Sequence, residues 1–139
     1  MKIEQARILV VDDDNVMRQF VVNLLTRLGA GQVMEAIDGE EGLDLASSFR
    51  PDLILSDIHM HPIDGLEFVK RLHSHPNAEL RKIPVLIMSV DSSNQTLRSA
   101  VPLGIAGYII KPPQISGLKL KIENALKFRM DSIAEGPRI

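Results

Sequence analysis

Five polar side chains that suit phosphoryl chemistry stand at the ends of four short apolar runs of the sequence. They are Asp12, Asp13, Asp57, Ser89 and Lys111. In an open sheet of parallel strands, functional groups gather at the carboxyl ends of the strands. If the four runs are strands of one such sheet, three carboxylates, one hydroxyl and one amine meet at a single edge.

Three carboxylates at one edge require a cation, because burying like charges together is costly. Aspartate oxygens suit a hard cation such as Mg²⁺, which keeps several waters and often pairs with phosphate. Lys111 adds a second positive charge. Together the metal and the ammonium would neutralise the oxygens of a phosphoryl group while a carboxylate attacks in line. The five residues therefore predict a magnesium-dependent site at which a carboxylate accepts a phosphoryl group.

The elements that must position these groups alternate between short apolar runs and amphipathic stretches. The predicted strands are residues 8–11, 32–36, 53–56, 84–88 and 107–110. The predicted helices are residues 15–28, 39–49, 65–73, 91–99 and 114–129. Apolar strands between helices indicate a parallel sheet that is covered on both faces. We therefore expect an α/β protein, a (βα)5 flavodoxin-like doubly wound sheet of order 2-1-3-4-5, since five units are too few for an eight-stranded barrel.

Length and composition limit the class of protein. A chain of 139 residues fits one domain, expected over residues 1–130 with a flexible C-terminal tail over residues 131–139. The net charge of −2 lacks the basic excess of a general nucleic-acid binder, and the absence of cysteine excludes disulfides. No apolar run approaches the ~20 residues of a membrane span. We expect a cytoplasmic protein without direct nucleic-acid binding or membrane insertion.

Other acidic residues and the histidines have simpler explanations. Asp14, Asp38 and Asp64 precede predicted helices, where a carboxylate caps the first turn. The four histidines are His59, His61, His73 and His75. The last two are two residues apart, a step that points helical side chains away from each other, so the histidines do not indicate a zinc site.

Four motifs in order closely resemble the receiver domains of two-component response regulators, including the stand-alone receivers of chemotaxis. They are ILVVDDD at 8–14, DIHM at 57–60 followed by DG at 64–65, PVLIMS at 84–89, and GYIIKP at 107–112. The similarity runs from about residue 7 to residue 129. Each motif alone is moderately specific, whereas all four at predicted strand ends are very specific.

The resemblance implies a role for each site residue. Asp57 matches the phosphoacceptor, and Lys111 matches the lysine that contacts the acyl phosphate. Ser89 and Tyr108 match the switch hydroxyl and the switch aromatic. The residues that match the Mg²⁺ ligands are Asp12, Asp13, Asp57 and, through its backbone carbonyl, His59. The bond between Lys111 and the following proline is often cis in this family.

The resemblance also implies partners. A histidine kinase or a histidine phosphotransfer protein would supply the phosphoryl group from a phosphohistidine. Phosphorylation would then change the surface formed by the fourth helix, the fifth strand and the fifth helix, where a downstream protein target binds or leaves. Such a domain is a signalling module and not an enzyme, since it catalyses only its own phosphotransfer and slow self-dephosphorylation.

Three positions depart from the family pattern. His61 stands where the family usually has proline directly after methionine, and Pro62 follows it. Val90 is bulkier than the usual residue after the switch hydroxyl, and Pro113 replaces a common aromatic. Val90, with His59 and Asp91, is expected to hinder water and to give a long-lived phosphoryl group.

Two other hypotheses remain open. A haloacid-dehalogenase-like phosphatase also uses a strand-end aspartate, a hydroxyl and a lysine, but it needs an acidic pair after the lysine and leaves Asp57 without a role. After Lys111 the sequence offers only Glu123, Asp131 and Glu135. Alternatively, the chain is a receiver cut from a longer transcription factor or kinase.

Overall fold

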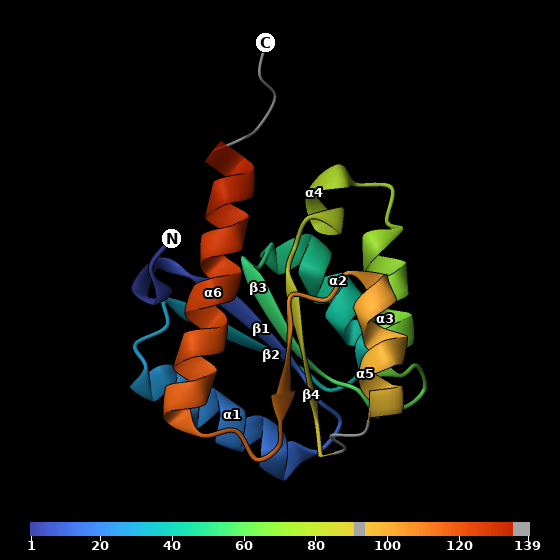
Figure 1. The fold of residues 1–139 in the computed structure, drawn as a ribbon, viewed down its shortest axis with the longest axis horizontal. Coiled ribbons are helices and arrows are strands. Elements are labelled where there is room, and N and C mark those ends of the chain that lie inside the picture. Colours follow the sequence, from blue (N-terminus) through green and yellow to red (C-terminus); the bar gives the residue numbers. More distant parts are fainter. Residues whose placement is uncertain (91–93, 135–139) are drawn as a thin grey trace.

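The chain folds around one sheet of five parallel strands. The structure is a computed structural model that describes residues 1–90 and 94–134. The strands are β1 (Arg7–Val11), β2 (Gln32–Ala36), β3 (Leu53–Asp57), β4 (Val85–Ser89) and β5 (Gly107–Ile110). They lie in the order β2-β1-β3-β4-β5, and every neighbouring pair is parallel (Figure 1). The predicted flavodoxin-like order is confirmed.

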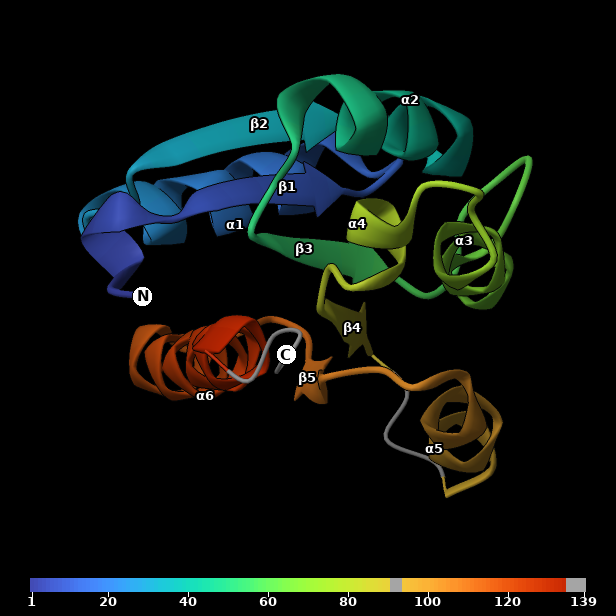
Figure 2. The ribbon, with the colours of Figure 1, turned by 90° about the horizontal axis from the view of Figure 1, so that it is seen from above.

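Helices cover both faces of this sheet. They are α1 (Asn15–Arg27), α2 (Gly39–Phe49), α3 (Gly65–His73), α4 (Ala78–Arg81), α5 (Asn94–Ala100) and α6 (Ile115–Ala134), with 3-10 turns η1 (Ile3–Gln5) and η2 (Val101–Leu103). Figure 2 shows α1 and α6 on one side of the sheet, and α2, α3 and α5 on the other. The chain therefore winds outward in both directions from the central strands, which leaves a switch point between β1 and β3.

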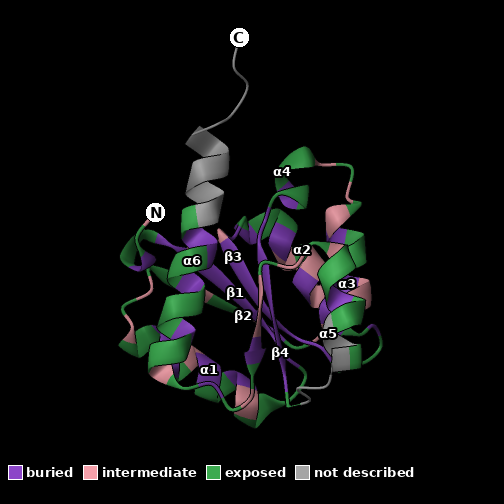
Figure 3. Cartoon of the chain, viewed as in Figure 1, coloured by how far each residue is buried: buried purple, intermediate pink, exposed green. Residues whose placement is uncertain are grey.

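Two hydrophobic layers fill the space between the sheet and the helices. Ile8 and Val10 of β1 belong to the layer beneath α1 and α6, whereas Leu9 and Val11 belong to the layer beneath α2, α3 and α4. This alternation follows from the two-residue period of a strand. Because both faces are covered, all residues of β3 and β4 are buried (Figure 3). Burial on both faces explains why these strands are nearly continuous apolar runs in the sequence.

Three aspartates begin the helices that follow β1, β2 and β3. Asp14 accepts hydrogen bonds from two backbone N–H groups in the first turn of α1. Asp38 and Asp64 each accept one from the residue three positions later in α2 and α3. They satisfy donors that every helix N-terminus leaves unpaired. The predicted capping roles are confirmed.

The helices differ from expectation in their extent. α4 has no counterpart among the predicted helices, because four residues are too few to show a helical period. The helix predicted over residues 91–99 is observed as α5, which begins at Asn94, and Asp91 lies outside the described residues. α6 continues past the predicted end at residue 129 to Ala134, so residues 131–134 are helical where a flexible tail is expected. The domain boundary at residue 130 stays a prediction.

Among the described residues, no helix combines the length and the apolar character that crossing a membrane requires.

Candidate functional site

Asp12 and Asp57 meet at the carboxyl edge of the sheet because β1 and β3 are neighbours. Val11 of β1 lies opposite Ser56 of β3 in the parallel register. Asp12 and Asp57, which follow these two residues, therefore lie side by side at the same edge of the sheet. Both carboxylates are buried, with Asp12 0% and Asp57 7% exposed. The predicted convergence of these two residues at one sheet edge is confirmed.

Lys111 reaches across the sheet to both carboxylates. Its backbone N–H donates to the carbonyl of Ser89 at 2.8 Å, which continues the β4–β5 ladder by one residue. Its Nζ lies 3.0 Å from Asp12 Oδ2 and 3.1 Å from Asp57 Oδ1. The lysine side chain is only 7% exposed. One ammonium is therefore shared between two buried carboxylates from different strands.

Asp13 adds a third carboxylate at the open side of the site. One oxygen each from Asp12, Asp13 and Asp57 lies within 4.8 Å of the others, and Asp13 is exposed. Three anions face one ammonium, so the cluster carries a local charge of −2. Hard oxygen donors with one open side suit Mg²⁺, which keeps part of its water shell. The residues present therefore fit the predicted metal.

Burial raises the pKa of the Asp57 carboxyl above its ordinary value of 3.8, and the negative charge of Asp12 raises it further. The Lys111 ammonium and a hydrogen bond from the backbone of His59 oppose this shift without cancelling it. Loss of hydration on burial is the main cause of the raised pKa, and more positive charge than that of Lys111 would be needed to offset it. A divalent cation beside Asp57 would supply that charge and favour the ionised, nucleophilic form.

The loop after Asp57 is held close to the end of β3. The backbone N–H of Gly65 donates to the carbonyl of Ile58 at 2.7 Å. A Cβ atom at Gly65 would collide with the backbone of Asp57 and Ile58, so only glycine fits there. The backbone N–H of His61 donates to Asp13 Oδ2 at 3.2 Å, a bond that proline cannot make. The departure at position 61 therefore adds a contact to a predicted metal ligand.

The predicted switch residues lie one and two strands from Asp57. Ser89 is 1% exposed and ends β4, one residue after Met88, which is opposite Asp57 in the β3–β4 register. Tyr108 is half-buried and packs against the hydrophobic layer beneath α2 and α3. The positions suit the expected roles, which stay predictions.

Two further sequence expectations concern the Lys111–Pro112 bond and Val90. The Lys111–Pro112 bond is cis, as the resemblance implies, and the His61–Pro62 bond is cis as well. Val90 is 72% exposed, and its expected effect on the access of water to Asp57 stays a prediction.

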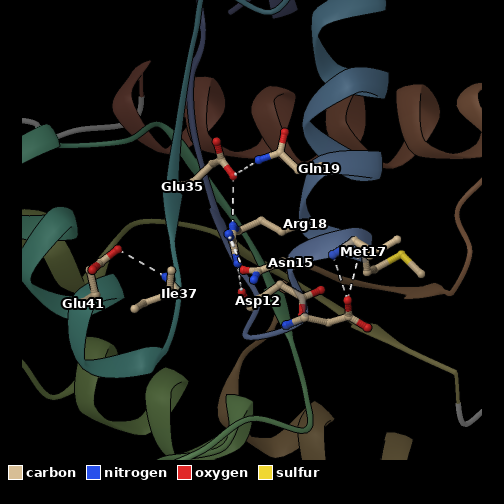
Figure 4. A network of polar contacts seen from close by, with 10 residues as sticks. Asp12, Asn15, Met17, Arg18, Gln19, Glu35, Ile37 and Glu41 are labelled. Atoms are coloured by element: carbon tan, nitrogen blue, oxygen red, sulfur yellow. Dashed lines mark hydrogen bonds and ion pairs between the residues drawn. The ribbon is translucent and has the colours of Figure 1, made fainter.

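One residue of the site was not singled out from the sequence. Arg18 of α1 is 8% exposed and donates a hydrogen bond to the backbone carbonyl of Asp12 at 2.8 Å (Figure 4). An arginine inside an amphipathic helix gives no sequence signal of burial, because arginine is mostly found on surfaces.

Comparisons with known proteins agree with this geometry. The family model "Response regulator receiver domain" matches residues 8–123. Chemotaxis protein CheY-3 of Vibrio cholerae is 32% identical over 117 residues, which cover 84% of this chain and 88% of the relative. The chemotaxis protein CheY homolog of Campylobacter jejuni is 34% identical, with coverages of 86% and 92%. The solved structure of Vibrio cholerae CheY4 superposes with a TM-score of 0.79 at 30% identity, covering 87% of this chain and 98% of that one. A family match over most of the chain, together with the observed fold, shows that this protein belongs to the response regulator receiver family.

Proposed function

We propose that this protein is a phosphorylation-activated signalling switch of the cytoplasm whose Asp57 accepts a phosphoryl group from a phosphohistidine. The observation that carries the proposal is the placement of Asp57, a buried carboxylate with a raised pKa, 3.1 Å from the Lys111 ammonium. Asp12 and Asp13 lie beside it and would hold Mg²⁺ together with Asp57 and the backbone carbonyl of His59.

The transfer follows from the positions of these groups. An oxygen of Asp57 attacks phosphorus in line with the P–N bond of the phosphohistidine. That bond breaks, the imidazole leaves and takes up a proton, and an acyl phosphate remains on Asp57. Mg²⁺, when bound, supplies charge neutralisation for the phosphoryl oxygens. Lys111 loses its contact with the Asp57 carboxylate and can donate to a phosphoryl oxygen instead, which stabilises the product.

Ser89 and Tyr108 would convert the acyl phosphate into a change of surface. The Ser89 hydroxyl would move to donate to a phosphoryl oxygen, and Tyr108 would turn inward. The surface formed by α5, β5 and α6 would then bind or release a protein target. A histidine kinase or a histidine phosphotransfer protein would be the phosphodonor.

Phosphotransfer to Asp57→Asn tests the acceptor. This variant keeps the shape of the side chain and removes its nucleophilic oxygen, so acid-labile, hydroxylamine-sensitive labelling by a panel of phosphorylated histidine kinases should be lost. Asp64→Asn is a matched control, because asparagine keeps the helix cap while removing a carboxylate at the end of the same loop. Full labelling of Asp57→Asn would disprove the assignment.

The phosphatase alternative makes an opposite prediction. A phosphatase would turn over small phosphate esters many times, whereas a receiver would hydrolyse only its own acyl phosphate. We therefore expect no sustained release of phosphate from such esters in the presence of Mg²⁺.

A further inference from the structure

Arg18 connects three elements next to the acidic cluster. Its guanidinium donates to the backbone carbonyl of Asp12 at 2.8 Å, to Glu35 Oε1 at 2.9 Å and to Asn15 Oδ1 at 2.7 Å. Figure 4 shows these bonds reaching from α1 to the end of β1 and to β2. Three directed hydrogen bonds from one buried, planar cation fix the positions of all three acceptors.

Every polar group of Asp12 is held by a partner. Its backbone N–H donates to Ala36, its carbonyl accepts from Arg18, and its carboxylate accepts from the Asp14 N–H at 2.9 Å and from Lys111 at 3.0 Å. The Arg18 bond is made where the chain leaves β1 and turns toward α1. The start of the turn that carries Asp12 and Asp13 is therefore anchored to α1 by a main-chain contact.

We infer that Arg18 is a positioning residue for the metal site: it holds the backbone at Asp12 so that the carboxylates of Asp12 and Asp13 stay in ligand geometry. The inference rests on the proposed Mg²⁺ site. A side chain that orients a metal ligand, without touching the metal, commonly alters metal affinity by about 10–100-fold when removed.

The charge of Arg18 is compensated within the same network. Glu35 pairs with it, and Gln19 also donates to Glu35 Oε1, at 2.8 Å. The Arg18–Glu35 pair is neutral, so the guanidinium can anchor Asp12 without adding a net positive charge beside a cation site. This arrangement explains why a buried arginine is compatible with cation binding so close to it.

A positioning role and a purely electrostatic role of Arg18 predict opposite changes in Mg²⁺ affinity for Arg18→Met. If Arg18 acted only through its charge, its removal would make the cluster more negative and would strengthen Mg²⁺ binding. If Arg18 positions Asp12, its removal weakens Mg²⁺ binding despite the gain in negative charge. The sign of the change therefore separates the two explanations.

The experiment is a titration with Mg²⁺ that is monitored through the amide NMR shifts of two segments, the turn that carries Asp12 and Asp13 and the loop after Asp57. We expect Arg18→Met to bind Mg²⁺ about tenfold more weakly than wild type. Arg18→Lys should show most of the same loss, because an ammonium keeps the charge but cannot reproduce the planar fork. Gln19→Ala is the matched control, since it breaks a bond to Glu35 without touching Asp12, and it should bind as wild type does.

A second variant separates positioning from general loss of stability. Arg18→Met combined with Glu35→Met removes both members of the ion pair, which should restore much of the unfolding free energy. Recovered stability with Mg²⁺ binding still about tenfold weak would support positioning. Recovery of Mg²⁺ affinity along with stability would overturn it, as would unchanged or stronger binding in Arg18→Met or wild-type affinity in Arg18→Lys. If wild type itself showed no Mg²⁺-dependent shifts at these residues, the proposed metal site would fail instead, which is a different result.

Discussion

The two ends of the β1–β3 pair differ in how their charges are balanced. At the amino end, the backbone N–H of Arg7 donates to Asp52 Oδ2 at 2.9 Å, and the Asp52 N–H donates to the Arg7 carbonyl at 2.7 Å. The Arg7 guanidinium stacks 4.5 Å from the centroid of the Phe49 ring. One cation and one anion close this end. At the carboxyl end, three carboxylates face the single ammonium of Lys111.

The same two strands therefore carry a structural contact at one end and the proposed functional site at the other. At the balanced end, one positive charge and one negative charge match in number. The unbalanced end holds two buried carboxylates with insufficient positive charge, which costs folding free energy until a cation binds. An excess of carboxylates over cations therefore distinguishes the candidate site from the opposite end of the strands, and added Mg²⁺ should stabilise that end only.

The largest effect is expected at the carboxyl end, for Lys111→Met. Without Lys111, the buried carboxylates lose their only ammonium partner among the described residues, so we expect the unfolding free energy in EDTA to fall by about 3 kcal/mol. Saturating Mg²⁺ should restore much of this loss by binding the folded state. Urea unfolding with EDTA and with Mg²⁺ measures both values. Lys119→Met on the exposed side of α6 is the control, and an equal loss in both buffers would contradict the comparison.

A smaller effect is expected at the amino end, for Asp52→Ala. The variant removes the acceptor of the Arg7 N–H and should cost about 2 kcal/mol, the scale of a part-buried donor left without its charged partner. The loss should be the same in EDTA and in Mg²⁺, because no cluster of metal ligands lies at this end among the described residues. Asp44→Ala, at an exposed position of α2, should change stability little. Rescue of Asp52→Ala by Mg²⁺ would show that the two ends are coupled.

The smallest effect concerns pH and Asp57→Asn. Since the folded-state pKa of Asp57 is raised above 3.8, the folded protein holds this proton more tightly than the unfolded chain. Its contribution to stability is therefore lost as pH rises from about 3.8 through the raised folded value, and absent Mg²⁺ Asp57 destabilises the domain at neutral pH. We expect Asp57→Asn to be more stable than wild type at pH 7 in EDTA, by on the order of 1 kcal/mol.

That advantage should shrink as pH falls toward 4, because wild-type Asp57 becomes neutral. It should also shrink when Mg²⁺ is added to wild type. Thermal unfolding of both proteins across this pH range tests the sign. A wild-type protein that is more stable than Asp57→Asn at pH 7 in EDTA would show that Lys111 alone already compensates the charge.

The strand ends were predictable from sequence, whereas the network behind them was not. Short apolar runs that stop at Asp12, Asp57 and Lys111 identify both the sheet and its functional edge, because parallel strands align their carboxyl ends. The roles of Arg18 and of the His61 N–H depend on which atoms meet across elements. Neither a periodic pattern nor a propensity carries that information.

Helix limits were predictable only where a local signal exists. Asp14 and Asp38 mark their helix starts through capping, which involves only neighbouring residues. No comparable stop signal follows residue 129, and α6 runs on to Ala134. Burial was also only partly predictable. The spacing of Phe20 places it with the apolar residues of α1, yet this residue is 42% exposed.

The hydrogen bond from His61 to Asp13 has a consequence for how related chains are compared. It is made by the main chain, so nineteen of the twenty amino acid types at position 61 retain the donor and only proline removes it. A substitution table would score histidine against proline as a difference of side chains on an exposed loop. In the structure, the difference is the presence or absence of one main-chain N–H that donates to the Asp13 carboxylate. A comparison of related chains should therefore separate proline from all other residues at this position, because only proline removes the main-chain donor to Asp13.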